Sequence, residues 1–469
     1  MKYKKYNLLL LASLFFLGAC DKELQQDDLQ AIGDANAFET IEHVQLGVNG
    51  AYGGYTIQNA EIFKTSLVSD ELKIGPDNGG SGALTFRYQY GSDGTTGGDV
   101  TADYGPYYTM IDQVNRVLPH VYTVTGGTQA RKDQLQGSLL GLRAIAHFHL
   151  LRSFAKNYDP AGVGIAIVTT VNPTAKPARS TMGDVITQIE ADLTAAKNLL
   201  PAPTLATFSD TVLNKLNIAA YQARIALYKG DYPAAIAFAT EVISSNIRPL
   251  VTGAVYAGIW TDENAYSIPP PSNEVLFRTR LLNSTLLGGR FTAVGGTIFL
   301  SPSDKLYDAY GVGDIRRDIF IGTIGANRYV NKHFASSRGG RIVDIKAIRT
   351  SEIYLIRAEA YAKLATPNLS AGAADLNAVR EKRITPYVAE TFATSADLVA
   401  AVLQERFKEL CFEASRIYDL KRNNLPVQRL ASDASPEWQT LPANSHLFVF
   451  PIPRAAISAN PNIVQNDDY

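Results

Sequence analysis

Acidic and basic side chains gather in residues 405–422 and have the types needed for acid–base chemistry. On a single helix, Glu409, Glu413 and Arg416 would lie four and three residues apart on one face. One interpretation is a catalytic acid–base cluster. The alternative is a set of ion pairs, either on an exposed helix or buried against other helices, where pairing avoids an isolated charge. We favour the structural interpretation.

Other arrangements that support catalysis or metal binding are absent from the sequence or weak. His147 and His149 would point about 200° apart on a helix, so they cannot share a metal ion. There is no His-Glu-x-x-His or Gly-x-Ser-x-Gly motif, and the glycine-rich residues 91–99 lack the ending of a phosphate-binding loop. Asp70 and Glu71 would suit a glycosidase only across a cleft. We therefore expect no enzyme activity, no metal and no cofactor.

The chain begins with a short apolar segment. Residues 8–17 follow three lysines and are about half as long as a membrane-spanning helix requires. Such a segment is typical of a secretory signal. Leu-Gly-Ala-Cys at 17–20 resembles the cleavage box of bacterial lipoproteins, which implies a signal peptide over residues 1–19 and lipidation of Cys20. The alternative is an ordinary signal with a chance cysteine. The polar residues 20–33 then form a flexible tether.

Composition narrows the range of partners. The chain has 469 residues, of which 46% are hydrophobic, enough to build a full core. Its net charge of −1 gives no basic face for nucleic acid. Cys411 is the only other cysteine, so lipidation of Cys20 leaves no intrachain disulfide.

The elements that must position these residues are mainly helices. Apolar residues recur at intervals of three and four in residues 135–150, 186–200, 213–227 and 403–417. In residues 215–243 two helices share a short turn, where Gly230 permits a tight reversal. The turn and second helix loosely resemble a tetratricopeptide repeat. We expect a mainly α fold whose scaffold is built from helical hairpins of tetratricopeptide-like type.

Three long segments interrupt this helical pattern. They lie near residues 75–105, 158–180 and 252–301, and they are rich in glycine, proline or polar residues. Loops longer than about 15 residues within a compact domain are usually functional or disordered. We therefore predict irregular insertions with a few short strands, and we expect them to carry the binding function.

Eight motifs in order resemble the SusD/RagB family of nutrient-binding lipoproteins of Bacteroidetes-type bacteria. They are "YYTMIDQVNRVLPHV", "LLGLRAIAHFHLLRSFAKNYDP", "ARSTMGDVITQIEADL", "KLNIAAYQARIALYKGDYPAAIAFATEVI", "RTSEIYLIRAEAYAKL", "DLNAVREKR", "ERFKELCFEASRIYDLKR" and "FVFPIPRAAISANPNIVQN". The resemblance implies one SusD-like α-helical domain over residues 34–469. It also implies a non-catalytic role, an outer-membrane location and a SusC-type TonB-dependent transporter as partner.

Candidate ligand-binding residues lie in the first and third insertions. Aromatic rings cover the apolar face of a sugar, and polar side chains bond its hydroxyl groups. The aromatic candidates are Phe86, Tyr88, Tyr90, Tyr104, Trp260, Tyr266 and Phe291, and the polar candidates are Asp77, Asn78 and Asp93. For each ring the alternative is packing within the core.

The sequence leaves the ligand open. A glycan is the first hypothesis, because it suits tyrosine- and tryptophan-bearing polar loops. An oligopeptide is the second, favoured by the low tryptophan count and bound by strand-like pairing. A glycan hydrolase is third. The acidic residues after Cys20 resemble surface-export signals, so we expect the lipid anchor to hold the protein on the cell exterior.

Overall fold

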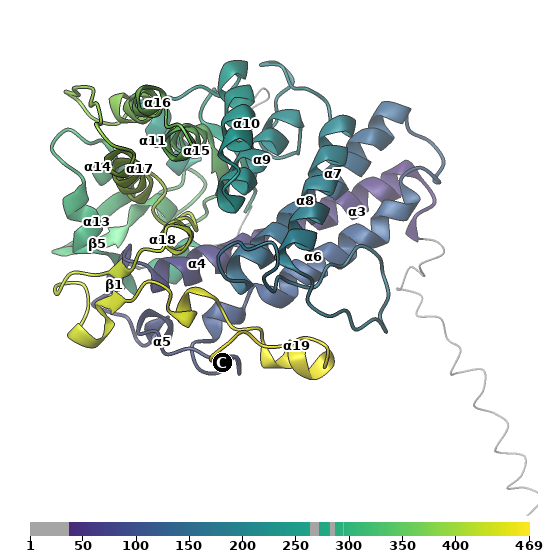
Figure 1. Cartoon of the computed structure of the whole chain (residues 1–469), viewed down its shortest axis with the longest axis horizontal. Coiled ribbons are helices and arrows are strands. Elements are labelled where there is room, and N and C mark those ends of the chain that lie inside the picture. Colours follow the sequence, from purple (N-terminus) through teal and green to yellow (C-terminus); the bar gives the residue numbers. More distant parts are fainter. Residues whose placement is uncertain (1–36, 263–271, 282–286, 294) are drawn as a thin grey trace, which may run out of the picture.

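The computed structural model describes residues 37–262, 272–281, 287–293 and 295–469. The predicted signal peptide and tether, together with Cys20 and Tyr266, lie outside these residues. Within them the predicted mainly α fold is confirmed (Figure 1). The helices of the first half are α3 (Ile41–Gly54), α4 (Gln58–Val68), α5 (Ala83–Phe86), α6 (Tyr104–Val117), α7 (Gln129–Phe154), α8 (Met182–Leu199), α9 (Lys215–Lys229) and α10 (Tyr232–Ser245). Those of the second half are α11 (Gly253–Thr261), α12 (Gly288–Phe291), α13 (Asp304–Ala309), α14 (Arg316–Phe320), α15 (Thr350–Lys363), α16 (Leu369–Glu381), α17 (Ser395–Glu409), α18 (Arg416–Arg422) and α19 (Arg454–Ala459).

The strands are short and pair only in twos within the described chain. They are β1 (Leu72–Ile74), β2 (Val275–Thr279), β3 (Leu300–Pro302), β4 (Ile321–Ile324), β5 (Asn327–Val330), β6 (Ile345–Arg349), β7 (Val427–Gln428) and β8 (Thr440–Leu441). All four pairs, β1–β3, β2–β6, β4–β5 and β7–β8, are antiparallel. The sheets therefore join loops locally and leave the framework to the helices.

Consecutive helices pack as hairpins, as the apolar spacing predicts. α7 packs on α8, α9 on α10 and α15 on α16, and α10 also packs on α15 (Figure 1). Gly230 has φ +78° between α9 and α10, a conformation that glycine adopts without steric cost. At the start of α8 the Thr181 hydroxyl accepts a hydrogen bond from the Asp184 backbone N–H, which caps the first turn of the helix.

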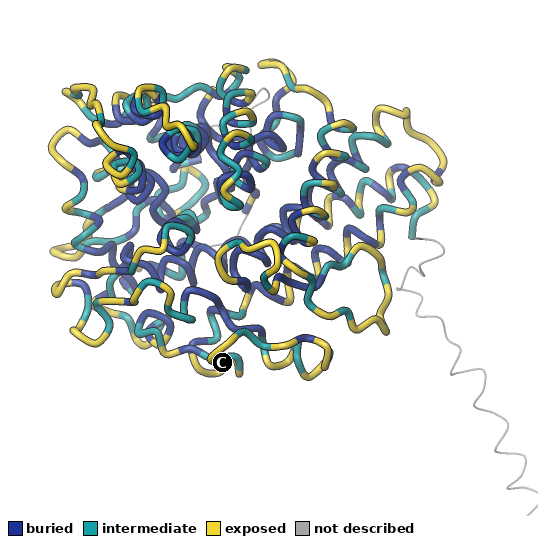
Figure 2. The backbone as a smooth tube through the Cα atoms, in the orientation of Figure 1, coloured by how far each residue is buried: buried dark blue, intermediate teal, exposed yellow. Residues whose placement is uncertain are grey.

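The hydrophobic core runs along the inner faces of these hairpins. Figure 2 shows buried backbone where helices face one another and exposed backbone mainly in the outer loops. The small side chains of Ala219, Ala220 and Ala223 on α9 are fully buried, as are those of Ala235 and Ala239 on α10. Small residues at such a contact let two helix axes approach closely. Among the described helices, none has the length and apolar character required to traverse a lipid bilayer.

Two predictions about local structure are wrong. Residues 405–422 do not form one helix, because α17 ends at Glu409 and the chain turns before α18 begins. Phe412 and Ala414 have left-handed φ values of +60° and +57° in this turn. The third insertion is also not irregular throughout, since it contains α11, β2 and α12. Every residue of β2 is buried, including the polar Arg278 and Thr279 at its end, so the strand lacks the alternation of apolar and polar residues that identifies a half-buried strand.

Candidate functional site

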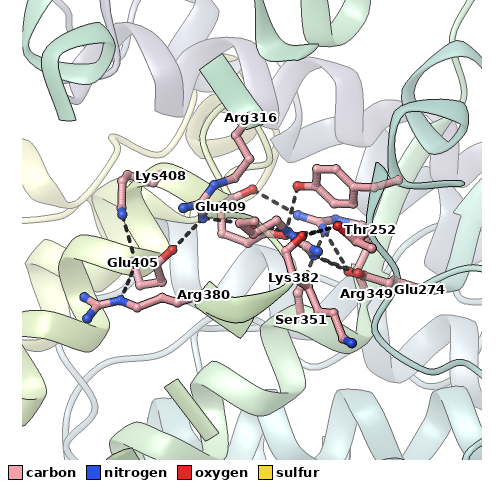
Figure 3. Close-up of polar contacts among 12 residues, drawn as sticks. Thr252, Glu274, Arg316, Arg349, Ser351, Arg380, Lys382, Glu405, Lys408 and Glu409 are labelled. Atoms are coloured by element: carbon pink, nitrogen blue, oxygen red, sulfur yellow. Dashed lines mark hydrogen bonds and ion pairs between the residues drawn. The ribbon is translucent and has the colours of Figure 1, made fainter. Parts of the chain in front are cut away.

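The acidic residues that end α17 lie inside the protein. Glu405 and Glu409 have fully buried side chains and belong to a cluster of ion pairs, which we call the buried charge network (Figure 3). Its members are Glu274, Arg316, Arg349, Arg380, Arg383, Glu405, Lys408 and Glu409. Most of them lie on α14, α16, α17 and β6. Glu274 lies immediately before β2, and Arg383 lies just after α16. The network therefore joins the helical hairpins to the third insertion.

Glu409 is the centre of the buried charge network. Its carboxylate oxygens accept hydrogen bonds from Arg316, Arg349 and Arg383 at 2.9 to 3.1 Å. Burial alone would raise the pKa of Glu409, but these three guanidinium charges overcome it and hold the pKa well below its usual value. A general acid must carry a proton near neutral pH and reach a substrate. Glu409 does neither, so the network holds the framework together.

A second buried cluster surrounds Glu61 on α4. Arg152 and Tyr418 each donate a hydrogen bond to its Oε1 at 2.8 Å. Tyr107 donates to Oε2 at 2.9 Å, and Nδ1 of His149 lies 2.5 Å from the same atom. Burial lowers the pKa of His149 to about 4, so its ring is neutral at neutral pH. This cluster ties α4 to α6, α7 and α18, and all its members are buried.

The adjacent carboxyl groups of Asp70 and Glu71 are buried as well. Arg416 binds Asp70 through two hydrogen bonds of 2.8 Å, and Lys305 adds a third at 2.7 Å. Although burial opposes it, this pairing lowers the pKa of Asp70 to about 2. Burial and the charge of Asp70 raise the pKa of Glu71 to about 8. The two groups therefore do not face each other across a cleft as a glycosidase pair would.

The first and third insertions lie side by side. β1 pairs with β3, and beyond β1 the Oδ2 atom of Asp77 accepts a hydrogen bond from the Ile298 backbone N–H at 3.0 Å. The side-chain amide of Asn78 donates to the Phe299 carbonyl at 2.8 Å. Asn78 is thus occupied in holding the two insertions together. Asp77 is exposed; its backbone N–H donates to the Ile298 carbonyl at 3.1 Å, and among the described residues Oδ2 is its one carboxylate oxygen with a hydrogen bond.

Most of the aromatic candidates are core residues. Their exposed fractions are 2% for Trp260 and Phe86, 0% for Phe291, 7% for Tyr90 and 4% for Tyr104. The Trp260 ring meets Phe320 edge-on with centroids 5.1 Å apart. The expectation that these rings present a face to a ligand therefore does not fit the structure. The sequence around Trp260 is polar and suggested an exposed ring, but Trp260 lies on the buried face of α11.

The remaining two candidates within the described chain are placed differently. Tyr88 is half-buried, with the guanidinium carbon of Arg429 4.6 Å from its ring centroid. Its hydroxyl is buried and has no hydrogen-bond partner among the residues that the structure describes. Asp93 is exposed, and its Oδ1 atom accepts hydrogen bonds of 3.0 Å from the backbone N–H groups of Thr95 and Thr96. Asp93 therefore shapes a turn in the first insertion.

Two half-buried rings that the sequence reasoning did not select lie beside the joined insertions. Tyr329 on β5 and Phe334 have ring centroids 4.6 Å apart. β5 packs against β3, which directly follows Phe299, a third half-buried ring. A hairpin signal was available in the sequence, because Gly325 begins the tight turn between β4 and β5 with φ +60°.

Arg341 connects the rings to the third insertion. Its guanidinium carbon lies 4.3 Å from the centroid of the Phe334 ring. Its Nε donates to the Thr292 carbonyl at 2.6 Å, and Nη2 contacts the Ala293 carbonyl. Arg341 also has φ +71°, a conformation that costs a non-glycine residue about 1–3 kcal/mol and often marks functional sites. We call the surface formed by Asp77, Asn78, Phe299, Tyr329, Phe334 and Arg341 the insertion face.

The second insertion lies elsewhere, against the C-terminal segment. Arg179 donates to the carbonyl of Val464 at 3.0 Å and to Asn466 Oδ1 at 2.8 Å. A groove of about 870 Å³ lies between this insertion and the C-terminal segment, and amide and charged side chains line much of it. The three insertions thus form two separate surfaces.

Comparison with known proteins supports the family resemblance. A model of the SusD family matches residues 300–469, and a second model, described as starch-binding associating with outer membrane, matches residues 35–227. "SusD-like protein P2" from Formosa agariphila is 22% identical over 513 residues, which cover 99% of both chains. "SusD-like protein P38" from the same organism is 21% identical and covers 91% of this chain and 93% of its own.

Solved structures share the fold over nearly the whole chain. A putative sugar binding protein from Bacteroides vulgatus superposes with a TM-score of 0.80 at 24% identity, covering 92% of this chain and 99% of the other. A SusD superfamily protein from Bacteroides thetaiotaomicron gives a TM-score of 0.79 at 22% identity, with 91% and 99% coverage. At this level of identity the likeness establishes the helical scaffold.

Proposed function

Because this chain belongs to the SusD family, we propose that it captures a glycan on the cell surface and delivers it to a SusC-type TonB-dependent transporter. The observation that carries the proposal is the insertion face. There Arg341 joins the half-buried ring of Phe334 to Thr292. Thr292 pairs with Ile298, which the exposed carboxylate of Asp77 contacts. The described residues offer no comparable acid–base site, because the carboxylates of the buried charge network are all enclosed. Capture therefore suits the geometry better than catalysis.

The insertion face has the chemistry that a sugar requires. Tyr329 and Phe334 supply apolar ring surface for the C–H face of a pyranose. Asp77 supplies a carboxylate oxygen to accept from hydroxyl groups, and Arg341 stiffens the loop beneath Phe334. Asn78 acts indirectly, because its amide holds the first insertion against the third.

We propose that a lipid anchor on Cys20 holds the capture site at the outer membrane. Cleavage before Cys20 and acylation of its thiol leave residues 21–33 as a short acidic tether ahead of the folded body. The family description that matches residues 35–227 names association with the outer membrane. We propose that the anchor holds the protein on the exterior side.

Calorimetric titration of a soluble form starting at Lys22 with a broad panel of neutral oligosaccharides tests glycan capture. Binding of at least one oligosaccharide supports the proposal, and the absence of measurable binding to every member of the panel contradicts it. Co-purification of a β-barrel transporter with the native lipoprotein from detergent-solubilised outer membranes tests the delivery step. A lipoprotein that purifies alone under mild detergent conditions contradicts that step.

An oligopeptide is the alternative ligand for the same role. Trp260, one of the two tryptophans, is buried, so only Trp438 remains as a half-exposed indole platform. Mass spectrometry of small molecules released from the native protein separates the two ligands. Peptides in the released fraction favour the alternative, and oligosaccharides favour the glycan.

A further inference from the structure

A second concave surface lies between the first long helices, away from the insertion face. The groove has a volume of about 670 Å³ and runs between α3 and α7. The end of β2 and residues 211–212 close one side of it. On α3 and the turn that follows, its lining extends from Gln45 to Thr56, which corresponds to roughly 16 Å at the rise of an α-helix. We call it the α3–α7 groove.

The charge of this groove is one-sided. Arg131, Arg278 and Arg280 line it, and no Asp or Glu is among the described residues that do so. Arg278 is compensated from behind by Asp210, which accepts from its Nε at 2.8 Å, and by Asp262 and Asp344. Arg280 is also engaged in an interaction within the protein, so Arg131 carries the available charge. Arg131 is exposed and lies in the first turn of α7, where the helix dipole adds positive potential. The rim therefore attracts an anionic group.

Neutral polar groups make up much of the rest of the lining. Ser138 and Thr279 are 2% and 6% exposed and contribute hydroxyl groups to the floor, next to the half-buried Tyr52. The Thr279 hydroxyl is buried and has no hydrogen-bond partner in the described protein. Leaving such a group unpaired costs about 1–3 kcal/mol. A ligand hydroxyl or acid oxygen in the groove would satisfy it.

We propose that the α3–α7 groove binds an acidic saccharide, that is, a polyhydroxylated ligand that carries a carboxylate or sulfate. Arg131 contacts the acid group, because a guanidinium forms two parallel bonds to such an anion. Thr279 and Ser138 bond the hydroxyl groups, and the side chains of Gln45, Asn49 and Gln134 on the two helices engage the remainder. Because a neutral sugar offers Arg131 no anionic group, we expect it to bind less tightly here. This site stands apart from the insertion face and does not depend on it.

The groove is built on regular secondary structure. α3 and α7 carry most of its lining and pack against each other in the main core cluster. A site on packed helices is already formed before the ligand arrives, so binding costs little ordering entropy. The groove volume also falls within the range of about 300–1,000 Å³ that is typical of small-molecule sites.

Isothermal titration with trigalacturonate tests the proposal, and its fully methyl-esterified form removes only the charge. We expect the wild-type protein to bind trigalacturonate at least tenfold more tightly than the ester. Arg131→Ala should weaken trigalacturonate binding at least tenfold and abolish the preference. Arg317→Ala is the matched control, because Arg317 is a surface arginine of α14 paired with the exposed Asp318, and it should change nothing.

Thr279→Val gives a second, independent readout. The change keeps the shape of the side chain and removes the unpaired hydroxyl, so the free energy of unfolding should stay constant or rise while trigalacturonate binding weakens. The proposal is overturned if the wild-type protein does not bind trigalacturonate. It is also overturned if Arg131→Ala leaves the affinity for trigalacturonate unchanged. Neutral-glycan binding at the insertion face should persist in both groove variants, so the two sites can fail separately.

Discussion

Replacing Glu409 with Gln tests whether the buried charge network stabilises the fold. The substitution keeps the size of the side chain and removes the negative charge that three guanidinium groups share. Breaking one partner of a buried ion pair typically costs about 3–5 kcal/mol, because the remaining charge stays buried without compensation. The free energy of unfolding of such a domain is about 5–15 kcal/mol, so the loss is a large part of the total.

The structure places the loss at the lower end of this range. Each of the three arginines keeps another carboxylate after the change, and the oxygen of the introduced amide still accepts a hydrogen bond. The retained pairs are Arg316 with Asp314, Arg349 with Glu413 and Arg383 with Glu274. We therefore expect Glu409→Gln to lower the free energy of unfolding by about 3 kcal/mol at pH 7, measured by urea denaturation followed by circular dichroism.

The control is the same chemical change on the surface. Glu190 is 45% exposed at its side chain and pairs with Lys229, so Glu190→Gln should cost no more than about 1 kcal/mol. The pKa of Glu409 is lower in the folded protein than the unfolded value of about 4.3, so its stabilisation is present above that pH and is lost as the pH falls. The difference from wild type should therefore shrink below about pH 4. Equal losses for the two variants at pH 7 would refute the reasoning.

Three further predictions concern single residues. Because burial raises the pKa of Glu71 to about 8, above its unfolded value, Glu71 costs stability as the pH rises from about 4.5 to 8; Glu71→Gln should raise the melting temperature at pH 8 and not at pH 4, and an equal shift at both would contradict this. Cys20→Ser should move the protein from the membrane fraction to the soluble fraction, whereas Cys411→Ser, in a buried thiol, should leave it in the membranes; continued sedimentation of the Cys20 variant would argue against the anchor. Trp260→Ala should lower the free energy of unfolding by about 3–5 kcal/mol, because the ring is buried; a fully stable variant that only loses ligand would reverse this assignment.

The sequence predicted the framework because helix signals are local. Spacing of apolar residues predicted α7, α8 and α9, and Gly230 predicted the turn before α10. The end of the helix at Glu409 was not predicted. Phe412 and Ala414 adopt left-handed conformations there, and only tertiary packing holds them in place. The helical spacing of apolar residues continues from residue 403 to residue 417, through the turn, and therefore predicted a single helix.

The candidate site was predictable only in part. Asp77 and Asn78 lie where the first and third insertions meet, but the side-chain amide of Asn78 is used to bond the first insertion to the third. Aromatic residue type alone does not distinguish a ring in the core from one on the surface. The sequence therefore predicted Trp260 and Phe291 as ligand-binding rings although both are buried, and it gave no such prediction for the half-buried Tyr329 and Phe334. Exposure depends on contacts between segments far apart in the sequence, and periodicity does not report those.

Glycan affinity of a Tyr329→Ala, Phe334→Ala double variant tests glycan capture by the insertion face most directly. Stacking on rings of this kind contributes about 0.5–1.5 kcal/mol for each aromatic contact, so the dissociation constant should rise roughly tenfold or more. Tyr122→Ala removes a 45%-exposed ring remote from the insertion face and should leave the affinity unchanged. An unaltered dissociation constant for the double variant, in a protein that remains folded, would contradict the account.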